Sequence, residues 1–179
     1  MLNCRKLMLI VMASAAILCG CTQSNIVSPT SGTVAGDGRP DVEVSKDIKI
    51  DWTEVREDLR DQFLEPYGEF ADYVMDLDVR YDQGKKLLTV LLPVSRKTTE
   101  DIAAVYGEAV LKIIGESVSM QSFYYEAPDV EDADSTYYGS FFDENDVCVK
   151  VFPYDKENDE SAYILIDTIK AGEQRALQY

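Results

Sequence analysis

Apolar side chains recur at helical spacing in the segment 51–68. Four of them are separated by three, four and four positions, which places them on one side of a helix. Asp51 can cap the first turn, and Pro66 favours an end shortly after the last apolar position. We expect Trp52 to anchor the core, with an exposed platform for a ligand as the alternative. The predicted core side consists of Trp52, Val55, Leu59 and Phe63.

Residues 73–94 predict a β-hairpin. Apolar and mostly acidic side chains alternate with a period of two over residues 73–82. The run LLTVLLPV at 87–94 is almost continuously apolar, which is typical of a strand covered on both faces. Between them, DQGKK at 82–86 predicts a turn in which Gly84 can take a positive φ.

A second helix is predicted to follow the hairpin. Thr98 or Thr99 can cap its start, and the apolar positions from Ile102 to Ile113 form a broad face. Gly115 stands where a helix commonly ends.

The remaining segments predict strands and set the fold class. Residues 120–126, 135–142, 146–154 and 161–169 are rich in β-branched and aromatic side chains, with acidic turns between them. A helix, a hairpin, a helix and three or four strands in this order favour the α+β class. We expect two helices packed on one face of an antiparallel sheet of about five to six strands.

The first twenty residues differ from the rest of the chain. Arg5 and Lys6 precede an uncharged, mostly apolar run from Leu7 to Leu18. As a helix this run of about twelve residues spans roughly 18 Å, too short for a bilayer core of about 30 Å. A basic start, a short apolar run and a small residue at its end are typical of a signal peptide.

The end of this run, Leu18-Cys19-Gly20-Cys21, resembles the lipobox of bacterial lipoproteins. There an aliphatic residue stands three positions before an acceptor cysteine and a small residue stands directly before it. The resemblance implies that Cys21 is lipidated, becomes the mature N-terminus and anchors the exported protein to the cell membrane or outer membrane. Cys19 as the acceptor would put bulky Leu18 in the small position. An ordinary secretory signal and a buried helix are the alternatives.

This interpretation divides the chain into three parts. Residues 1–20 form the signal peptide, residues 21–46 a lipidated flexible tether rich in Ser, Thr, Gly and Pro, and residues 47–179 a single α+β domain. Removal of Arg5 and Lys6 leaves 15 basic and 33 acidic side chains, a formal charge of −18. Such a surface repels nucleic acid and suits cations or basic partners, unless it serves solubility alone.

Few residue types remain for catalysis or metal binding. The chain has no histidine, which excludes Ser-His and Cys-His triads and His-ligated metals. Asp132 and Asp134 are spaced like the first ligands of an EF-hand, but Tyr137 occupies the position that needs glycine. Cys148 lies between valines, which favours a buried structural thiol over a nucleophile. We expect neither a cofactor nor a metal site, although acidic loops can gather cations.

Tyrosines beside carboxylates are the remaining candidate for a binding surface. Tyr124, Tyr125, Tyr137 and Tyr138 flank the acidic loop that contains Asp132 and Asp134. Outward tyrosines there can bind a glycan or a basic peptide, or they simply suit half-buried strands. We therefore expect a lipid-anchored extracytoplasmic domain that binds an envelope protein, a basic peptide or a glycan. The alternative is a small cell-envelope hydrolase that uses paired carboxylates.

Overall fold

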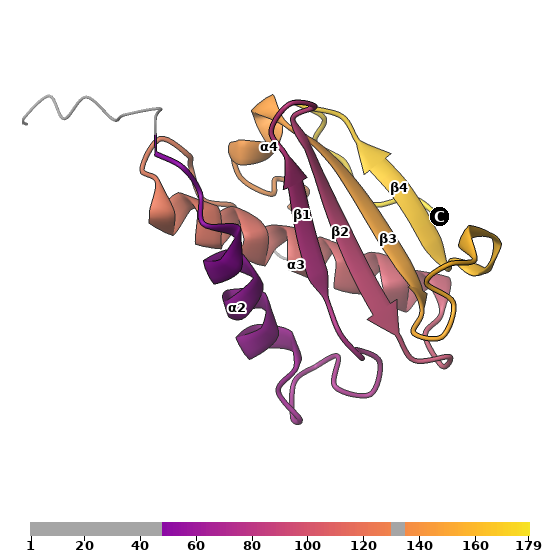
Figure 1. Ribbon diagram of the computed structural model, residues 1–179. Helices are drawn as coiled ribbons and strands as arrows, with labels where there is room; N and C mark the ends of the chain where they lie inside the picture. The colour runs from indigo at the N-terminus through magenta and orange to yellow at the C-terminus, as the bar shows by residue number, and fades with distance from the viewer. Residues whose placement is uncertain (1–47, 130–134) are drawn as a thin grey trace, which may run out of the picture. The chain divides into compact units, whose positions relative to one another are not determined.

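A computed structural model describes residues 48–129 and 135–179 of the chain (Figure 1). The predicted signal peptide, the cysteine predicted to be lipidated and the predicted tether lie outside the described residues, as do Asp132 and Asp134. In chain order the elements are α2 (Trp52–Phe63), β1 (Asp78–Asp82), β2 (Leu87–Val94), α3 (Glu100–Gln121), α4 (Phe141–Glu144), β3 (Asp146–Pro153), the 3-10 turn η1 (Glu160–Ala162) and β4 (Leu165–Ile169).

The first predicted helix is confirmed as α2. The Asp51 side chain accepts a hydrogen bond from the backbone N–H of Thr53 at 2.8 Å and so caps the first turn. Val55, Leu59 and Phe63 are buried, as their spacing predicts. Figure 1 shows that α2 and the longer α3 lie on the same face of the sheet, which confirms a two-layer α+β arrangement.

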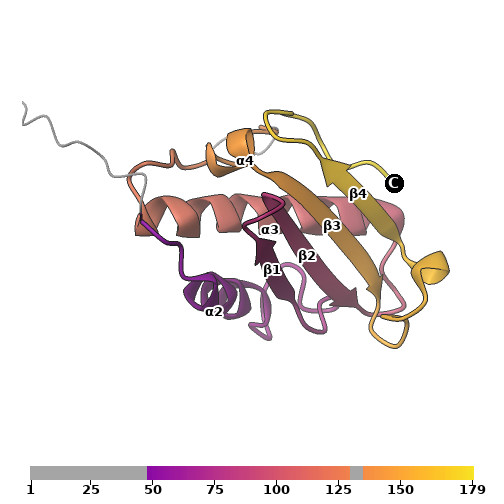
Figure 2. The ribbon, with the colours of Figure 1, turned by 45° about the horizontal axis from the view of Figure 1, so that its top comes forward.

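The sheet has four strands in the order β1-β2-β3-β4 (Figure 2). The two outer pairs are antiparallel, but β2 and β3 are parallel, with Leu87 opposite Asp146 and Val94 opposite Pro153. The predictions of a wholly antiparallel sheet and of five to six strands were therefore wrong. Parallel neighbours need a crossover connection. Helix α3 is that crossover, and its 22 residues span roughly 33 Å, enough to run back along β2.

Two of the predicted strands do not form. Residues 120–121 are the end of α3, the described residues 122–129 and 135–140 have no strand, and Phe141–Glu144 form the short helix α4. The backbones of Glu126 and Ser140 are instead joined, because the Ser140 N–H donates to the Glu126 carbonyl at 3.0 Å. The aromatic side chains that suggested strands pack on one another and on the core. β propensity largely measures such half-buried packing, so it does not by itself establish a ladder.

Helix α3 continues past Gly115, where the sequence predicted its end. A Cβ atom at Gly115 would lie 1.9 Å from the carbonyl oxygen of Tyr138, so the glycine allows another segment's backbone to touch the helix. The β1–β2 turn also differs from expectation. Lys86 takes a positive φ of 49°, and Gly84 does not.

The core lies between the helices and one face of the sheet. Leu88, Val90 and Leu92 of β2 are fully buried, and they alternate with residues that are half-buried on the opposite face. The continuous apolar run of β2 is thus covered on one face and only partly shielded on the other. Cys148 lies on this outer face and is half-buried, rather than buried as predicted.

The C-terminal residues close the domain against β4 and α3. The Arg175 guanidinium donates to both carboxylate oxygens of Asp167 at 2.6 and 2.9 Å and holds the pKa of Asp167 below its ordinary value. Leu177 is buried, and it fits against α3 because residue 107 is glycine, where a Cβ would lie 2.6 Å from the Leu177 side chain.

Gly115→Ala is expected to lower the free energy of unfolding by about 1–3 kcal/mol, because the added methyl group overlaps the Tyr138 carbonyl. The better helix propensity of alanine, worth about 1 kcal/mol, acts in the opposite direction. Urea denaturation measures the net effect. Gly84→Ala is the control, since its new Cβ meets only a side-chain oxygen of Asp82 at 3.4 Å. Equal losses in the two variants would contradict a tight contact at Gly115.

Candidate functional site

A pocket of about 600 Å³ lies at the end of the domain that carries the β1–β2 turn and α4. Four aromatic side chains line it together with residues 48–50 and Gln83. The aromatic residues come from the start of α2, from β1, from the loop after α3 and from α4. They are Trp52, Tyr81, Tyr125 and Phe141, and we call this site the aromatic pocket.

The four rings contact one another in an ordered way. The Trp52 and Tyr81 rings lie 5.0 Å apart, centre to centre, at an interplanar angle of 31°. Phe141 stands nearly edge-on to both at 5.6 Å, and Tyr125 stands edge-on to Phe141 at 5.4 Å. Such tilted and edge-to-face contacts are favourable for aromatic pairs. Phe141 is buried, whereas the other three are half-buried and pack against the core from its margin.

Hydrogen bonds hold the backbone next to Trp52 and the hydroxyl of Tyr81. The start of α2 is joined to the end of α3, because the Gln121 side chain accepts from the Asp51 N–H at 2.7 Å and donates to the Asp51 carbonyl at 3.2 Å. This holds Trp52, the next residue. The Tyr81 hydroxyl donates to the side-chain carbonyl of buried Asn145 at 2.6 Å, and the Asn145 amide donates to the Phe141 carbonyl at 2.8 Å.

Two carboxylates lie near the aromatic pocket. Burial raises the pKa of Tyr81, and the nearby carboxylates of Asp82 and Glu144 raise it further. Glu144 also accepts a hydrogen bond from the Tyr124 hydroxyl at 2.6 Å. Among the described residues that line the pocket, the basic one is Lys49, which is exposed.

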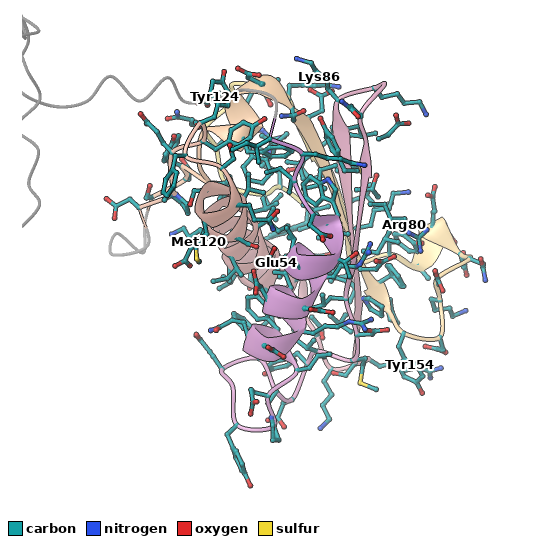
Figure 3. The ribbon with its side chains drawn as sticks, turned by 60° about the vertical axis from the view of Figure 1, so that its left-hand side comes forward. Glu54, Arg80, Lys86, Met120, Tyr124 and Tyr154 are labelled. Carbon is teal, nitrogen blue, oxygen red and sulfur yellow. The ribbon has the colours of Figure 1, made fainter. Side chains whose placement is uncertain are left out.

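An acidic hollow of about 290 Å³ lies beside α4. Its lining includes Tyr124, Glu126 and Asp143. Tyr137 is half-buried beside it, and the pKa of its phenol is raised by burial and then by the charges of Asp143 and Glu126. Figure 3 shows Tyr124 and Lys86 at this end of the domain and Tyr154 at the opposite end.

The structure brings together only part of the predicted binding surface. Tyr124 and Tyr125 are in ring contact at 5.0 Å, but they lie on the loop after α3 and not on a sheet face. Tyr138 is a core residue, only 3 % exposed, and its hydroxyl donates to the Arg175 carbonyl at 3.2 Å. Tyr137 is half-buried near the acidic hollow, and so it belongs neither to the core nor to the ring pair of Tyr124 and Tyr125.

Sequence reasoning missed Tyr81 and Phe141 as pocket residues. Both were assigned to strands, and nothing in either strand pattern shows that an aromatic residue of β1 meets one of α4. Trp52 packs against the core, as predicted, and its half-buried ring also lines the pocket.

Other candidate chemistry finds less support in the described part of the chain. Within residues 48–129 and 135–179, no group of three or more His, Cys, Asp or Glu side chains could hold a metal ion. A general acid needs a carboxyl group whose pKa is raised. The clear carboxyl shifts among these residues are all downward; an example is Asp167, through its contact with Arg175.

Tyr81→Phe is expected to lower the free energy of unfolding by about 1–2 kcal/mol, because it leaves the buried Asn145 oxygen without its donor. Urea denaturation followed by Trp52 fluorescence measures this at the pocket itself, since Trp52 is the chain's single tryptophan. Tyr154→Phe removes an exposed hydroxyl far from the pocket and serves as the control. A loss no larger than that of the control would contradict the stabilising role of the Tyr81–Asn145 bond.

Comparisons of the chain with protein-family models, with curated proteins and with solved structures found no match.

Proposed function

We propose that this protein is a lipid-anchored extracytoplasmic binding domain that holds its ligand in the aromatic pocket. The observation that carries the proposal is the pocket itself, in which three half-buried aromatic rings and one buried ring line a cavity of about 600 Å³. Ligand sites are typically concave and mostly apolar, with a few polar groups at fixed positions. Here Gln83 and Lys49 are polar residues of the lining.

The proposed anchor rests on the sequence before the described residues. The lipobox-like Leu18-Cys19-Gly20-Cys21 supports lipidation of Cys21 and export of the rest of the chain. Two acyl chains bury enough methylene groups, at about 0.8 kcal/mol each, to anchor a domain stably. Across the described residues, no helix is at once long enough and apolar enough to span a bilayer.

The ligand classes that suit the site are a protein of the cell envelope, a basic peptide and a glycan. Aromatic rings can stack on sugars and can attract cations. The excess of acidic side chains opposes nucleic acid as a partner. The alternative of an envelope hydrolase with paired carboxylates gains no support from the described carboxyl groups.

Cys21→Ser is expected to abolish anchoring. The wild-type protein, expressed with its own leader in a bacterial host, should carry the mass of a lipid and partition into detergent, whereas the variant should stay aqueous. Intact mass spectrometry and phase separation in detergent measure both properties. Cys148→Ser is the matched control and should leave anchoring unchanged, because Cys148 lies within β3. An unmodified, aqueous wild-type protein would contradict the anchor.

Ligand binding in the aromatic pocket is expected to change the emission of Trp52. The full chain, purified in a neutral detergent, is titrated with hexalysine, hexaglutamate and cellohexaose at about 0.15 M salt. At least one probe should give a saturable change. Tyr125→Leu should weaken it by removing a ring from the pocket, and Tyr154→Leu at the opposite end should not. No saturable change with any probe would contradict a ligand site in the pocket.

A further inference from the structure

We propose that the occupant of the aromatic pocket is an organic cation, the lysine ammonium or arginine guanidinium group of a basic polypeptide. This inference rests on the proposed function, which makes the pocket a ligand site, and it adds the chemical class of the ligand.

The first argument is the set of rings. A cation within about 6 Å of an aromatic ring centre, over the face of the ring, is attracted by the negative π-cloud. The attraction is greatest for tryptophan and for partly desolvated sites. Trp52, Tyr81 and Tyr125 are each half-buried around the same cavity, so a side chain that enters it leaves bulk water and meets several rings at once.

The second argument is charge. The carboxylates of Asp82 and Glu144 are close enough to the Tyr81 hydroxyl to raise its pKa, and the Asp82 carboxylate also lies 3.4 Å from the Lys85 ammonium. Asp143 and Glu126 line the neighbouring acidic hollow. The whole chain carries a formal charge of −16. An excess of one sign of charge over the surface raises the local concentration of the opposite ion and speeds its association.

The third argument is an internal example. On the outer face of the sheet, the Lys150 ammonium lies 6.0 Å from the centre of the Tyr163 ring and 2.6 Å from a carboxylate oxygen of Glu160. An ammonium group, an aromatic ring and a carboxylate thus already combine in this fold. The aromatic pocket offers rings to a cation from outside, with the Asp82 and Glu144 carboxylates nearby and outside its lining.

Substitution of Lys49 can distinguish a cationic ligand from an anionic or a neutral one. It is exposed at the pocket, and its positive charge opposes the approach of a cation. Lys49→Glu should therefore tighten the binding of a cationic ligand, weaken that of an anionic ligand and leave that of a neutral sugar unchanged. Lys97→Glu is the matched control, because it makes the same charge change at an exposed site beyond the far end of β2.

The test titrates hexalysine, hexaglutamate and cellohexaose into the full-length wild type and the Lys49→Glu, Lys97→Glu and Tyr125→Leu variants, with Trp52 emission as the readout. We expect hexalysine to bind the wild type saturably. Lys49→Glu should tighten this binding about three- to tenfold, as expected for two partly screened charge interactions. Lys97→Glu should change it less than twofold, and Tyr125→Leu should weaken it. Far-UV circular dichroism confirms that each variant is folded.

Three outcomes would overturn the inference. Equal tightening by Lys49→Glu and Lys97→Glu would mean that hexalysine is attracted by the acidic surface as a whole. Saturable binding of hexaglutamate or cellohexaose without hexalysine would overturn the cation but leave the pocket as a ligand site. No binding of any probe would overturn both the inference and the proposed function.

Discussion

The parallel pairing of β2 with β3 is the constraint on which the rest of the structure depends. Parallel neighbours cannot be joined by a tight turn, so the chain must travel back along the sheet before β3 begins. Helix α3 makes that journey and in doing so covers the buried face of the strands. Its C-terminal end then delivers the following loop and α4 to the end of the sheet where the β1–β2 turn lies. The aromatic pocket is assembled from what meets there.

Local signals in the sequence identify the elements that form locally. The N-cap at Asp51, the helical spacing of Val55 and Leu59, and the bounds of β2 were all predictable, because each depends on neighbours within a few positions. The direction in which β3 pairs is different. Its alternation of Val147, Val149 and Val151 suits a parallel and an antiparallel neighbour equally well. The predicted number of strands was too high because an aromatic-rich sequence is compatible both with a β-strand and with a loop whose side chains pack on the core.

The candidate site was harder to predict than the fold. Trp52 and Tyr81 are 29 positions apart along the chain, and Tyr81 and Phe141 are 60 positions apart. Only the crossover brings the centres of these three rings within 6 Å of one another. The tyrosines that drew attention in the sequence separate in the structure, with Tyr125 at the pocket and Tyr138 in the core. The clustering of tyrosines in the sequence pointed to the correct region of the molecule. It did not show which of these tyrosines face the core and which line the pocket.

At two positions of helix α3 a glycine leaves room for another part of the chain to contact the helix closely. Gly107 admits Leu177 from the C-terminal residues, and Gly115 admits the backbone of Tyr138. These glycines are eight positions apart, a little over two turns, so the two contacts are offset by about 80° around the helix. During evolution a larger side chain at one core position can be offset by a smaller one at a neighbouring position. A backbone carbonyl has the same size in every sequence, so no substitution can offset a larger residue that meets it. A distant homologue with this fold should therefore retain a small residue at the position of Gly115, which gives a search for relatives a marker that does not depend on overall similarity.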